Sequence, residues 1–196
     1  METVLILDFG AQYSQLIARR VREQNVYCEV KPCSISPAEI EKIAPIGIIL
    51  SGGPQSVYES VSLRVDPALF ALGIPVLGIC YGCQLMAYSL GGTVAAATEA
   101  TAREYGKTLT EFDTHSAIFQ DLPASSVTWM SHGDYISRVP DGFTVTAKTA
   151  VCPTAAMACP EKRLYGVQFH PEVQHTVEGS EMLRRFLYTV CGASGD

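Results

Sequence analysis

One cysteine in the sequence has the neighbours that a catalytic nucleophile needs. Gly78-Ile79-Cys80-Tyr81-Gly82 has the form G-x-nucleophile-x-G, between an apolar run and a stretch with helical spacing. A strand–turn–helix elbow of this kind exposes its nucleophile at the carboxyl edge of a sheet, and it needs small residues where the backbone passes closely. The N-terminus of the following helix would favour the reactive thiolate. We therefore expect Cys80 to be a nucleophile rather than one more buried cysteine.

A histidine and a glutamate two positions apart offer the base and its orienting group. His170 and Glu172 follow the apolar run that ends at Gln168, and Pro171 lies between them. A proline keeps the preceding residue extended, and residues i and i+2 of an extended segment point to the same side. The carboxylate can then fix the tautomer and orientation of the imidazole. We predict a Cys80–His170–Glu172 triad, and His132 is the one serious rival for the base.

A glycine-rich turn supplies a candidate oxyanion hole. Ser51-Gly52-Gly53-Pro54 ends another apolar run, on a strand that should neighbour the elbow strand. The backbone N–H of Gly53, with that of Tyr81, would form a two-donor site for a developing oxyanion. A phosphate loop is disfavoured because Pro54 lacks an N–H and no Gly-Lys-Ser/Thr follows. An ordinary strand-to-loop turn stays open as the simpler interpretation.

Three other functions stay open at the level of residue patterns. Cys80 and Cys83 form a C-x-x-C pair, which would suit a thiol–disulfide protein, although the motif follows the fourth expected strand rather than the start of a thioredoxin-like unit. A peptidase of related fold could use the same triad on another substrate. A non-enzymatic module that kept the fold is the third, and the presence of both Cys80 and His170 argues against it.

The order of strand and helix signals predicts one α/β domain over residues 1–196. The first half alternates between the two, which implies a mostly parallel sheet flanked by helices on both faces. The expected strands there are Val4–Asp8, Tyr27–Val30, Ile46–Leu50 and Pro75–Ile79, and the expected helices are Tyr13–Gln24, Ala38–Ile43, Asp66–Leu72 and Tyr81–Leu90. The second half predicts an antiparallel extension with strands Val127–Met130, Phe143–Ala147 and Leu164–Phe169, and a last helix Glu178–Val190.

Bulk composition narrows the class of protein. The 196 residues are 47% hydrophobic, which is enough for one sizeable core. A net charge of −6 argues against binding nucleic acid, and seven irregularly spaced cysteines do not suit an oxidised secreted scaffold. No apolar run is long enough for a signal sequence or a membrane span. We expect a cytoplasmic enzyme that binds neither nucleic acid nor membrane.

Three motifs together resemble the class I, or triad, glutamine amidotransferases. They are Ser51–Pro54, Gly78–Gln84 and Phe169–Val173, in this order and spacing. The resemblance implies a flavodoxin-like fold and hydrolysis of glutamine by Cys80 as nucleophile, His170 as acid/base and Glu172 as orienter. It also implies that Gly53 and Tyr81 supply the oxyanion donors. Residues that would hold the glutamine are Gly52, Gln84, Ser131, His132, Gly133 and Asp134.

Other segments are similar, more specifically, to the amidotransferase part of GMP synthases. These are Ile6–Tyr13, Arg103–Gly106 and Trp129–Asp134. The resemblance implies that the ammonia serves to aminate XMP to GMP on an ATP-pyrophosphatase (synthetase) domain, which would bind ATP and Mg²⁺. Nothing here resembles the Ser-Gly-Gly-Val-Asp-Ser loop of that domain, so we expect neither cofactor nor metal in this chain. Cys191–Asp196 resembles the junction to that domain, which suggests an excised domain or a separate subunit.

Overall fold

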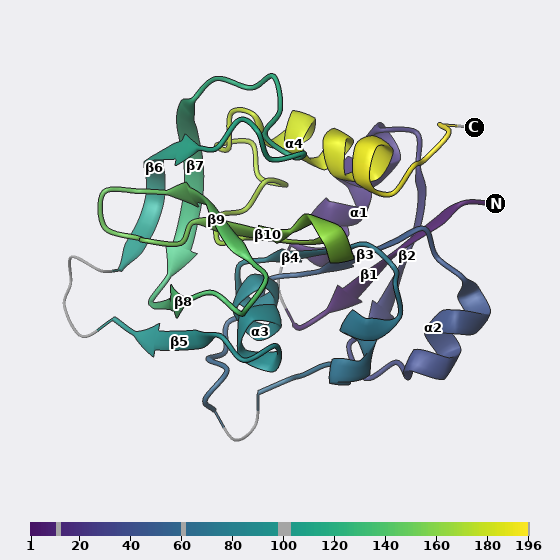
Figure 1. Ribbon diagram of the computed structural model, residues 1–196. Helices are drawn as coiled ribbons and strands as arrows, with labels where there is room; N and C mark the ends of the chain where they lie inside the picture. The colour runs from purple at the N-terminus through teal and green to yellow at the C-terminus, as the bar shows by residue number, and fades with distance from the viewer. Residues whose placement is uncertain (11–12, 60–61, 98–102, 196) are drawn as a thin grey trace.

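The centre of the molecule is a single nine-stranded sheet. The computed structural model describes residues 1–10, 13–59, 62–97 and 103–195 (Figure 1). The strand order is β2-β1-β3-β4-β11-β10-β9-β6-β7. The five strands from β2 to β11 are parallel to one another, and the remaining neighbours pair antiparallel. The predicted mostly parallel sheet with a late antiparallel extension is confirmed.

The bounds of the strands and helices are as follows. The strands are β1 (Thr3–Asp8), β2 (Tyr27–Pro32), β3 (Gly47–Leu50), β4 (Val76–Ile79), β5 (Thr93–Ala96), β6 (Glu104–Phe112), β7 (Ser125–His132), β8 (Asp134–Arg138), β9 (Thr144–Lys148), β10 (Ala156–Cys159) and β11 (Leu164–Val167). The α-helices are α1 (Ser14–Glu23), α2 (Pro37–Ile43), α3 (Tyr81–Ser89) and α4 (Gly179–Arg185). Short 3₁₀ turns are η1 (Pro67–Ala71) and η3 (Pro160–Lys162), and η4 (Phe186–Val190) is a π-helical turn.

Helices cover both faces of the parallel half, because successive side chains of its strands point to opposite faces. Val4 and Ile6 of β1 belong to one apolar cluster, which includes side chains of α1 and α4. Leu5 and Leu7 belong to a second cluster, which includes side chains of α2, η1 and α3. Figure 1 shows α1 and α4 on one side of the sheet and α2 and α3 on the other. Strands buried on both faces explain why this half reads as continuous apolar runs.

Two predicted helices differ from the structure. Asp66–Leu72 is only the 3₁₀ turn η1, which Asp66 caps by accepting a hydrogen bond from the Ala68 N–H. The helix predicted over Glu178–Val190 is α-helical only as far as Arg185. Its last turn widens, and the Cys191 N–H donates to the Phe186 carbonyl five residues earlier. Met182, Phe186, Leu187 and Val190 of this segment are nevertheless buried.

The strand prediction for the second half was incomplete. The strand expected to reach Phe169 ends at Val167, after which the chain crosses toward β7, where the His170 N–H donates to the Trp129 carbonyl. Strands β5, β6, β8 and β10 were not predicted. β6 has an inverted pattern, because Leu109 is exposed while Thr110 is fully buried and hydrogen-bonded to Thr128 across the ladder at 2.7 Å. β10 is Ala-Met-Ala-Cys, which lacks β-branched residues.

Ser131–Asp134 is the junction between two strands. Ser131 and His132 end β7, Gly133 intervenes, and Asp134 starts β8. β8 pairs with β5 in a small two-stranded sheet beside α3 (Figure 1). Two residues of the motif Ile6–Tyr13, Ala11 and Gln12, lie outside the described residues, as does Asp196 at the end of the chain. Within the described ranges, no helix combines the length and the apolar character that crossing a bilayer demands.

Candidate active site

The backbone at Cys80 has the geometry of a nucleophile elbow. β4 ends at Ile79 and α3 begins at Tyr81, so Cys80 is the turn between them. Its φ is 53° and its ψ is −109°, a left-handed conformation that is costly for a residue with a Cβ. A Cβ at Gly78 would lie 2.7 Å from the Gly82 carbonyl oxygen, and one at Gly82 would lie 2.5 Å from that of Leu50. Both glycines of the G-x-C-x-G motif are therefore required by close backbone contacts.

We expect Gly78→Ala to destabilise the fold and to remove activity by displacing the elbow. The added methyl group would meet backbone atoms of α3, which cannot move aside as a side chain can, and overpacking of this kind costs about 1–3 kcal/mol. The measurement is the free energy of unfolding in urea. Gly133→Ala is the control for stability, because its Cβ would have ordinary contacts, the nearest at 3.5 Å. Equal stability of the two variants would contradict the packing argument at the elbow.

The structure brings His170 and Glu172 together. His170 Nδ1 lies 3.0 Å from Glu172 Oε2, and both side chains are buried. The His170 backbone is held as well: its N–H donates to the Trp129 carbonyl, and its carbonyl accepts from Thr176 Oγ1 at 2.6 Å. Thr176 Oγ1 also accepts from the Trp129 N–H at 2.9 Å, so this hydroxyl ties His170 to β7. The imidazole is thereby fixed with Nδ1 toward the carboxylate, which leaves Nε2 for proton transfer.

The surroundings of His170 stabilise its protonated form. Burial lowers the pKa of this imidazole, but hydrogen bonds to Cys80 and Glu172 and the charges of both groups raise it by more. The net result is a pKa well above the ordinary histidine value. A histidine that stays protonated next to a cysteine can hand a proton to a leaving group.

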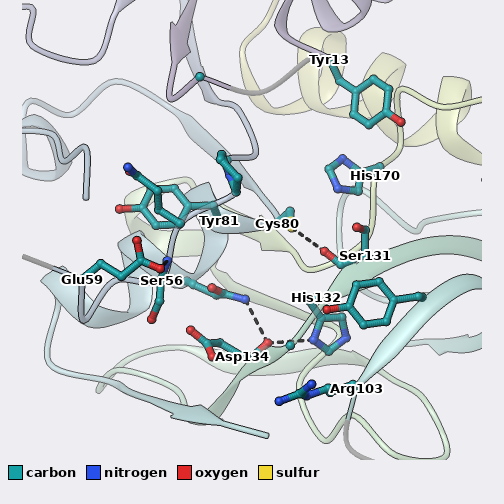
Figure 2. Close-up of a pocket in the computed structure, with 17 residues that line it drawn as sticks. Tyr13, Ser56, Glu59, Cys80, Tyr81, Arg103, Ser131, His132, Asp134 and His170 are labelled. Carbon is teal, nitrogen blue, oxygen red and sulfur yellow. Dashed lines mark hydrogen bonds between the residues drawn. The ribbon is translucent and has the colours of Figure 1, made fainter. Parts of the chain in front are cut away.

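Two further groups contact the sulfur of Cys80. Sγ lies 3.6 Å from the Ser131 carbonyl oxygen (Figure 2) and 3.6 Å from Gln168 Nε2, which donates to the sulfur. Gln168 is fully buried and accepts a hydrogen bond from Gln84 Nε2 at 3.0 Å. Gln168 was not predicted as a site residue. Its position two residues before His170 was the available signal.

A cleft of about 720 Å³ opens at the elbow. Figure 2 shows Cys80 and His170 on its wall, with Tyr13 beyond the imidazole and Ser131, His132 and Asp134 along one side. The residues that line it are Gly10, Tyr13, Gly53, Pro54, Gln55, Ser56, Glu59, Cys80, Tyr81, Gln84, Arg103, Tyr105, Ser131, His132, Gly133, Asp134 and His170. Tyr13, Glu59, Arg103 and Tyr105 were not predicted as site residues: Tyr13, Arg103 and Tyr105 lie in segments that resemble the family, but nothing in the sequence assigned them a role at the cleft.

Most of the predicted binding residues lie at this cleft, with two differences. Gly53 and Tyr81 both line it, and the N–H of Tyr81 is at the start of α3, where helical partners are lacking. Gly52 is not a lining residue. A Cβ there would lie 3.0 Å from His170 Cε1, so Gly52 instead makes room for the imidazole. Gln84 lines the cleft, but its amide nitrogen donates to the Asp134 carbonyl at 3.1 Å and to Gln168, which makes it a support for the cleft wall.

His132, the rival base, is engaged elsewhere. Its Nε2 lies 3.1 Å from Glu104 Oε1 and its Nδ1 lies 2.8 Å from the Asp134 carbonyl oxygen. Burial lowers its pKa, but interactions with Cys152 and Glu104 raise it by more, to about 9. With both ring nitrogens occupied by these partners, His132 is poorly placed to act on Cys80.

Cys83 does not suit a redox partner for Cys80. It lies within α3 with its side chain fully buried, and a Cβ on Gly166 would clash with its sulfur. Burial also raises the pKa of the Cys83 thiol well above the ordinary value. All seven cysteines are free thiols in the structure. The geometry therefore disfavours a thiol–disulfide function.

The family model for class I glutamine amidotransferases matches residues 5–190. The chain is a class I glutamine amidotransferase. A glutamine-hydrolyzing GMP synthase from Clostridium botulinum strain Alaska E43 is 55% identical over the whole chain, and one from strain Hall is 57% identical. This amidotransferase spans 37% and 38% of the length of these two curated relatives.

Solved structures agree with the assigned fold. A protein from Thermoplasma acidophilum, described as a subunit of GMP synthase, has a TM-score of 0.83 and is 31% identical. The match covers 97% of the amidotransferase and 94% of that chain. A glutamine amidotransferase from Thermotoga maritima has a TM-score of 0.80 at 20% identity, with 98% and 99% covered. The second likeness concerns the fold alone.

Proposed function

We propose that this amidotransferase hydrolyses glutamine to glutamate and ammonia through a thioester on Cys80. The observation that carries the proposal is the left-handed backbone of Cys80 at an elbow that faces a buried His170–Glu172 pair. The Cys80 thiolate attacks the side-chain amide carbon, forming the C–S bond, and the negative charge moves to the carbonyl oxygen. The N–H groups of Gly53 and Tyr81 stabilise that oxygen.

His170 serves first as acid and then as base. Its imidazolium protonates the amide nitrogen as the C–N bond breaks, so ammonia leaves and a γ-glutamyl thioester remains. Neutral His170 then takes a proton from water, the hydroxide adds to the thioester carbonyl, and the C–S bond breaks. Glutamate departs, and the thiolate–imidazolium pair is restored. Glu172 stabilises the imidazolium in both resting and final states.

The cleft carries charges that suit the amino-acid end of glutamine. Arg103 and Asp134 both line it, and Gly133 lies next to the Arg103 side chain, with a Cβ there 4.0 Å from Nε. A guanidinium pairs well with a carboxylate, so we assign the α-carboxylate to Arg103 and the α-ammonium to Asp134. Ser131, whose carbonyl contacts Cys80, lies between this end of the cleft and the nucleophile.

We expect Arg103→Ala to raise the KM for glutamine by roughly tenfold, with kcat changed much less. The loss of one charge-assisted contact that is made equally in the ground and transition states has this kinetic signature. Arg103→Lys should recover part of the affinity, and Arg19→Ala, an exposed arginine of α1 outside the cleft, is the control. Steady-state kinetics of glutamate formation would decide. A fall in kcat at constant KM would instead mean that Arg103 acts on the transition state and does not mainly bind glutamine.

The curated relatives support a proposal for the use of the ammonia. They are glutamine-hydrolyzing GMP synthases that are nearly three times as long as this chain. We therefore propose that the ammonia aminates XMP to GMP on an ATP-pyrophosphatase (synthetase) domain, which holds ATP and Mg²⁺, in the same or a separate chain. The ammonia must reach that domain unprotonated, because ammonium is no nucleophile, and this requires the two parts to dock.

If the two parts must dock, the rate of glutamine hydrolysis should depend on the synthetase domain. We expect slow glutamine hydrolysis by the amidotransferase alone and a roughly 100-fold increase with a synthetase domain that carries XMP and Mg-ATP, because docking favours a competent arrangement that is minor in isolation. Glutamate formation should be measured for the chain alone, with the domain, and with domain and nucleotides. Equal rates in all three measurements would favour a stand-alone hydrolase and contradict the coupling between the two parts. They would leave the proposed triad chemistry unaffected.

A further inference from the structure

A second group of reactive side chains lies beside the cleft and takes no part in the proposed reaction. Within the described ranges, one group of three His, Cys or acidic residues is close enough to share an ion: Glu104, His132 and Cys152. Glu104 begins β6, His132 ends β7, and Cys152 lies between β9 and β10. Their potential ligand atoms all lie within 4.8 Å of one another, and all three residues are buried. Carboxylate, imidazole and thiolate are the ligand types that zinc binds.

The ring of His132 is oriented as in many metal-bound histidines. Nδ1 lies 2.8 Å from the Asp134 carbonyl oxygen, which can only accept, so Nδ1 carries a hydrogen. Nε2 points to the other two members of the group and lies 3.1 Å from Glu104 Oε1. In the neutral ring this leaves the lone pair of Nε2 facing the centre of the group. A ligating histidine that donates its other N–H to a backbone carbonyl is the usual supporting arrangement at metal sites.

Thr149 holds the other two residues in place. Its hydroxyl donates to Glu104 Oε2 at 2.8 Å, which leaves Oε1 directed at His132. The same hydroxyl accepts from the Cys152 N–H at 2.9 Å and so fixes the segment that carries the thiol. Cys152 Sγ itself lies 3.3 Å from the Thr154 carbonyl. Glu104 and His132 thus each have an outer partner of the kind that metal sites use, whereas the Cys152 thiol donates to the Thr154 carbonyl and would give up that bond as a thiolate ligand.

We propose that Glu104, His132 and Cys152 form a binding site for Zn²⁺ or a cation of similar size and ligand preference. The 3.1 Å between Nε2 and Oε1 is close to the roughly 3.3 Å expected for two ligands about 2.0 Å from a tetrahedral ion. The thiolate of Cys152 is the third ligand and water the fourth. An ion would replace the proton that otherwise must lie between His132 and Glu104. This proposal departs from the expectation of no metal, and it is independent of the proposed glutaminase reaction.

The site would brace one wall of the cleft. His132 itself lines the cleft between Ser131, whose carbonyl contacts Cys80, and Asp134 (Figure 2). The ion would therefore link β6, the end of β7 and the β9–β10 segment beside the charged end of the cleft. Glu104 and His132 are 28 positions apart in the chain, and His132 and Cys152 are 20 positions apart. These separations explain why no sequence motif predicted the group.

The test uses Co²⁺ as a spectroscopic substitute for Zn²⁺. Cys80→Ala is the parent protein, because Cys80 and His170 are also a thiol and an imidazole that could take up the ion. We expect one Co²⁺ per chain with a sulfur-to-cobalt charge-transfer band and the intense visible bands of a tetrahedral site. A further Cys152→Ser change should remove the charge-transfer band and weaken binding at least about tenfold. Cys159→Ser, another buried cysteine, should change neither.

Two further measurements keep the proposal falsifiable should the Cys152 variant fold poorly. Thr149→Val keeps all three ligands but removes the hydroxyl that holds them, and it should weaken Co²⁺ binding about tenfold. X-ray absorption of the Zn²⁺-loaded Cys80→Ala protein should show a single sulfur together with nitrogen and oxygen ligands. No binding by Cys80→Ala, a zinc site with no sulfur or with several, or unchanged binding in Cys152→Ser or Thr149→Val would overturn the proposal.

Discussion

Cys80→Ala is expected to reduce glutamine hydrolysis by at least about 10⁴-fold, the largest effect of any single substitution in this amidotransferase. Cys80 is the only thiol among the described residues that line the cleft, and removal of a nucleophile leaves only binding and oxyanion stabilisation. Steady-state glutamate formation measures the loss. The variant should keep its fold, because the change removes one sulfur atom from the wall of the cleft.

The matched control is Cys83→Ala. Cys83 lies three residues away in α3, packed in the core against Gly166. Its truncation should lower stability but leave the chemistry in place. A glutamine-like electrophile should correspondingly label Cys80 and spare Cys83. Labelling of Cys83 with Cys80 intact would argue for the thiol–disulfide alternative, and glutamine hydrolysis retained by Cys80→Ala would contradict the assignment of Cys80 as the nucleophile.

Glu172→Gln should lower kcat by roughly 10² to 10⁴-fold while leaving Cys80 open to alkylation. In the proposed mechanism Glu172 makes no bond to substrate; it holds Nδ1 of His170, at 3.0 Å, and stabilises the imidazolium. Removal of Cys80 or His170 should therefore cost more. The amide can still hydrogen-bond to the ring, so the fold should survive the substitution.

The same variant has a predicted pH dependence. Cys80 and Glu172 raise the pKa of His170 against the opposing effect of burial, so loss of the Glu172 charge must lower that pKa. The proposed mechanism requires His170 to be protonated when ammonia leaves, so we expect activity to be lost as the pH rises through its pKa. The basic limb of the kcat/KM profile should therefore move to lower pH in Glu172→Gln. Glu178→Gln, a carboxylate outside the cleft, should leave the profile unchanged.

A contrary outcome is easily recognised. If Glu172→Gln matched the unmodified protein in both kcat and pH profile, the carboxylate would have no part in catalysis. A purely structural role would not account for this residue either, because its other carboxylate oxygen, Oε1, is buried and has no hydrogen-bond partner among the described residues.

The sequence predicted those parts of the site whose geometry is local. The elbow at Cys80 depends on Gly78 and Gly82, which are neighbours in the chain, and His170 lies two residues from Glu172. Gln168 and Arg103 escaped prediction because their roles depend on which distant elements the sheet brings to the cleft. The Glu104–His132–Cys152 group is the extreme case, since three separate segments meet there.

The strands and helices also divide into those that the sequence predicts and those that it does not. Runs such as Val4–Asp8 were predicted because burial on both faces leaves a continuous apolar signal. β6 was missed because its buried face includes the Thr110–Thr128 hydrogen bond while Tyr105 and Leu109 face outward. The widened turn at Phe186–Val190 was missed because its apolar spacing also suits an ordinary α-helix.

The most direct test of the central claim is to trap the thioester. The amidotransferase, alone and with a synthetase domain, would be incubated with glutamine, quenched in acid and analysed by mass spectrometry of its peptides. We predict an adduct on Cys80 with the mass of glutamine minus ammonia, which disappears after treatment with hydroxylamine and is absent from Cys80→Ala. Glutamate formation without any such adduct, or an adduct on another cysteine, would contradict the assignment of Cys80 as the nucleophile.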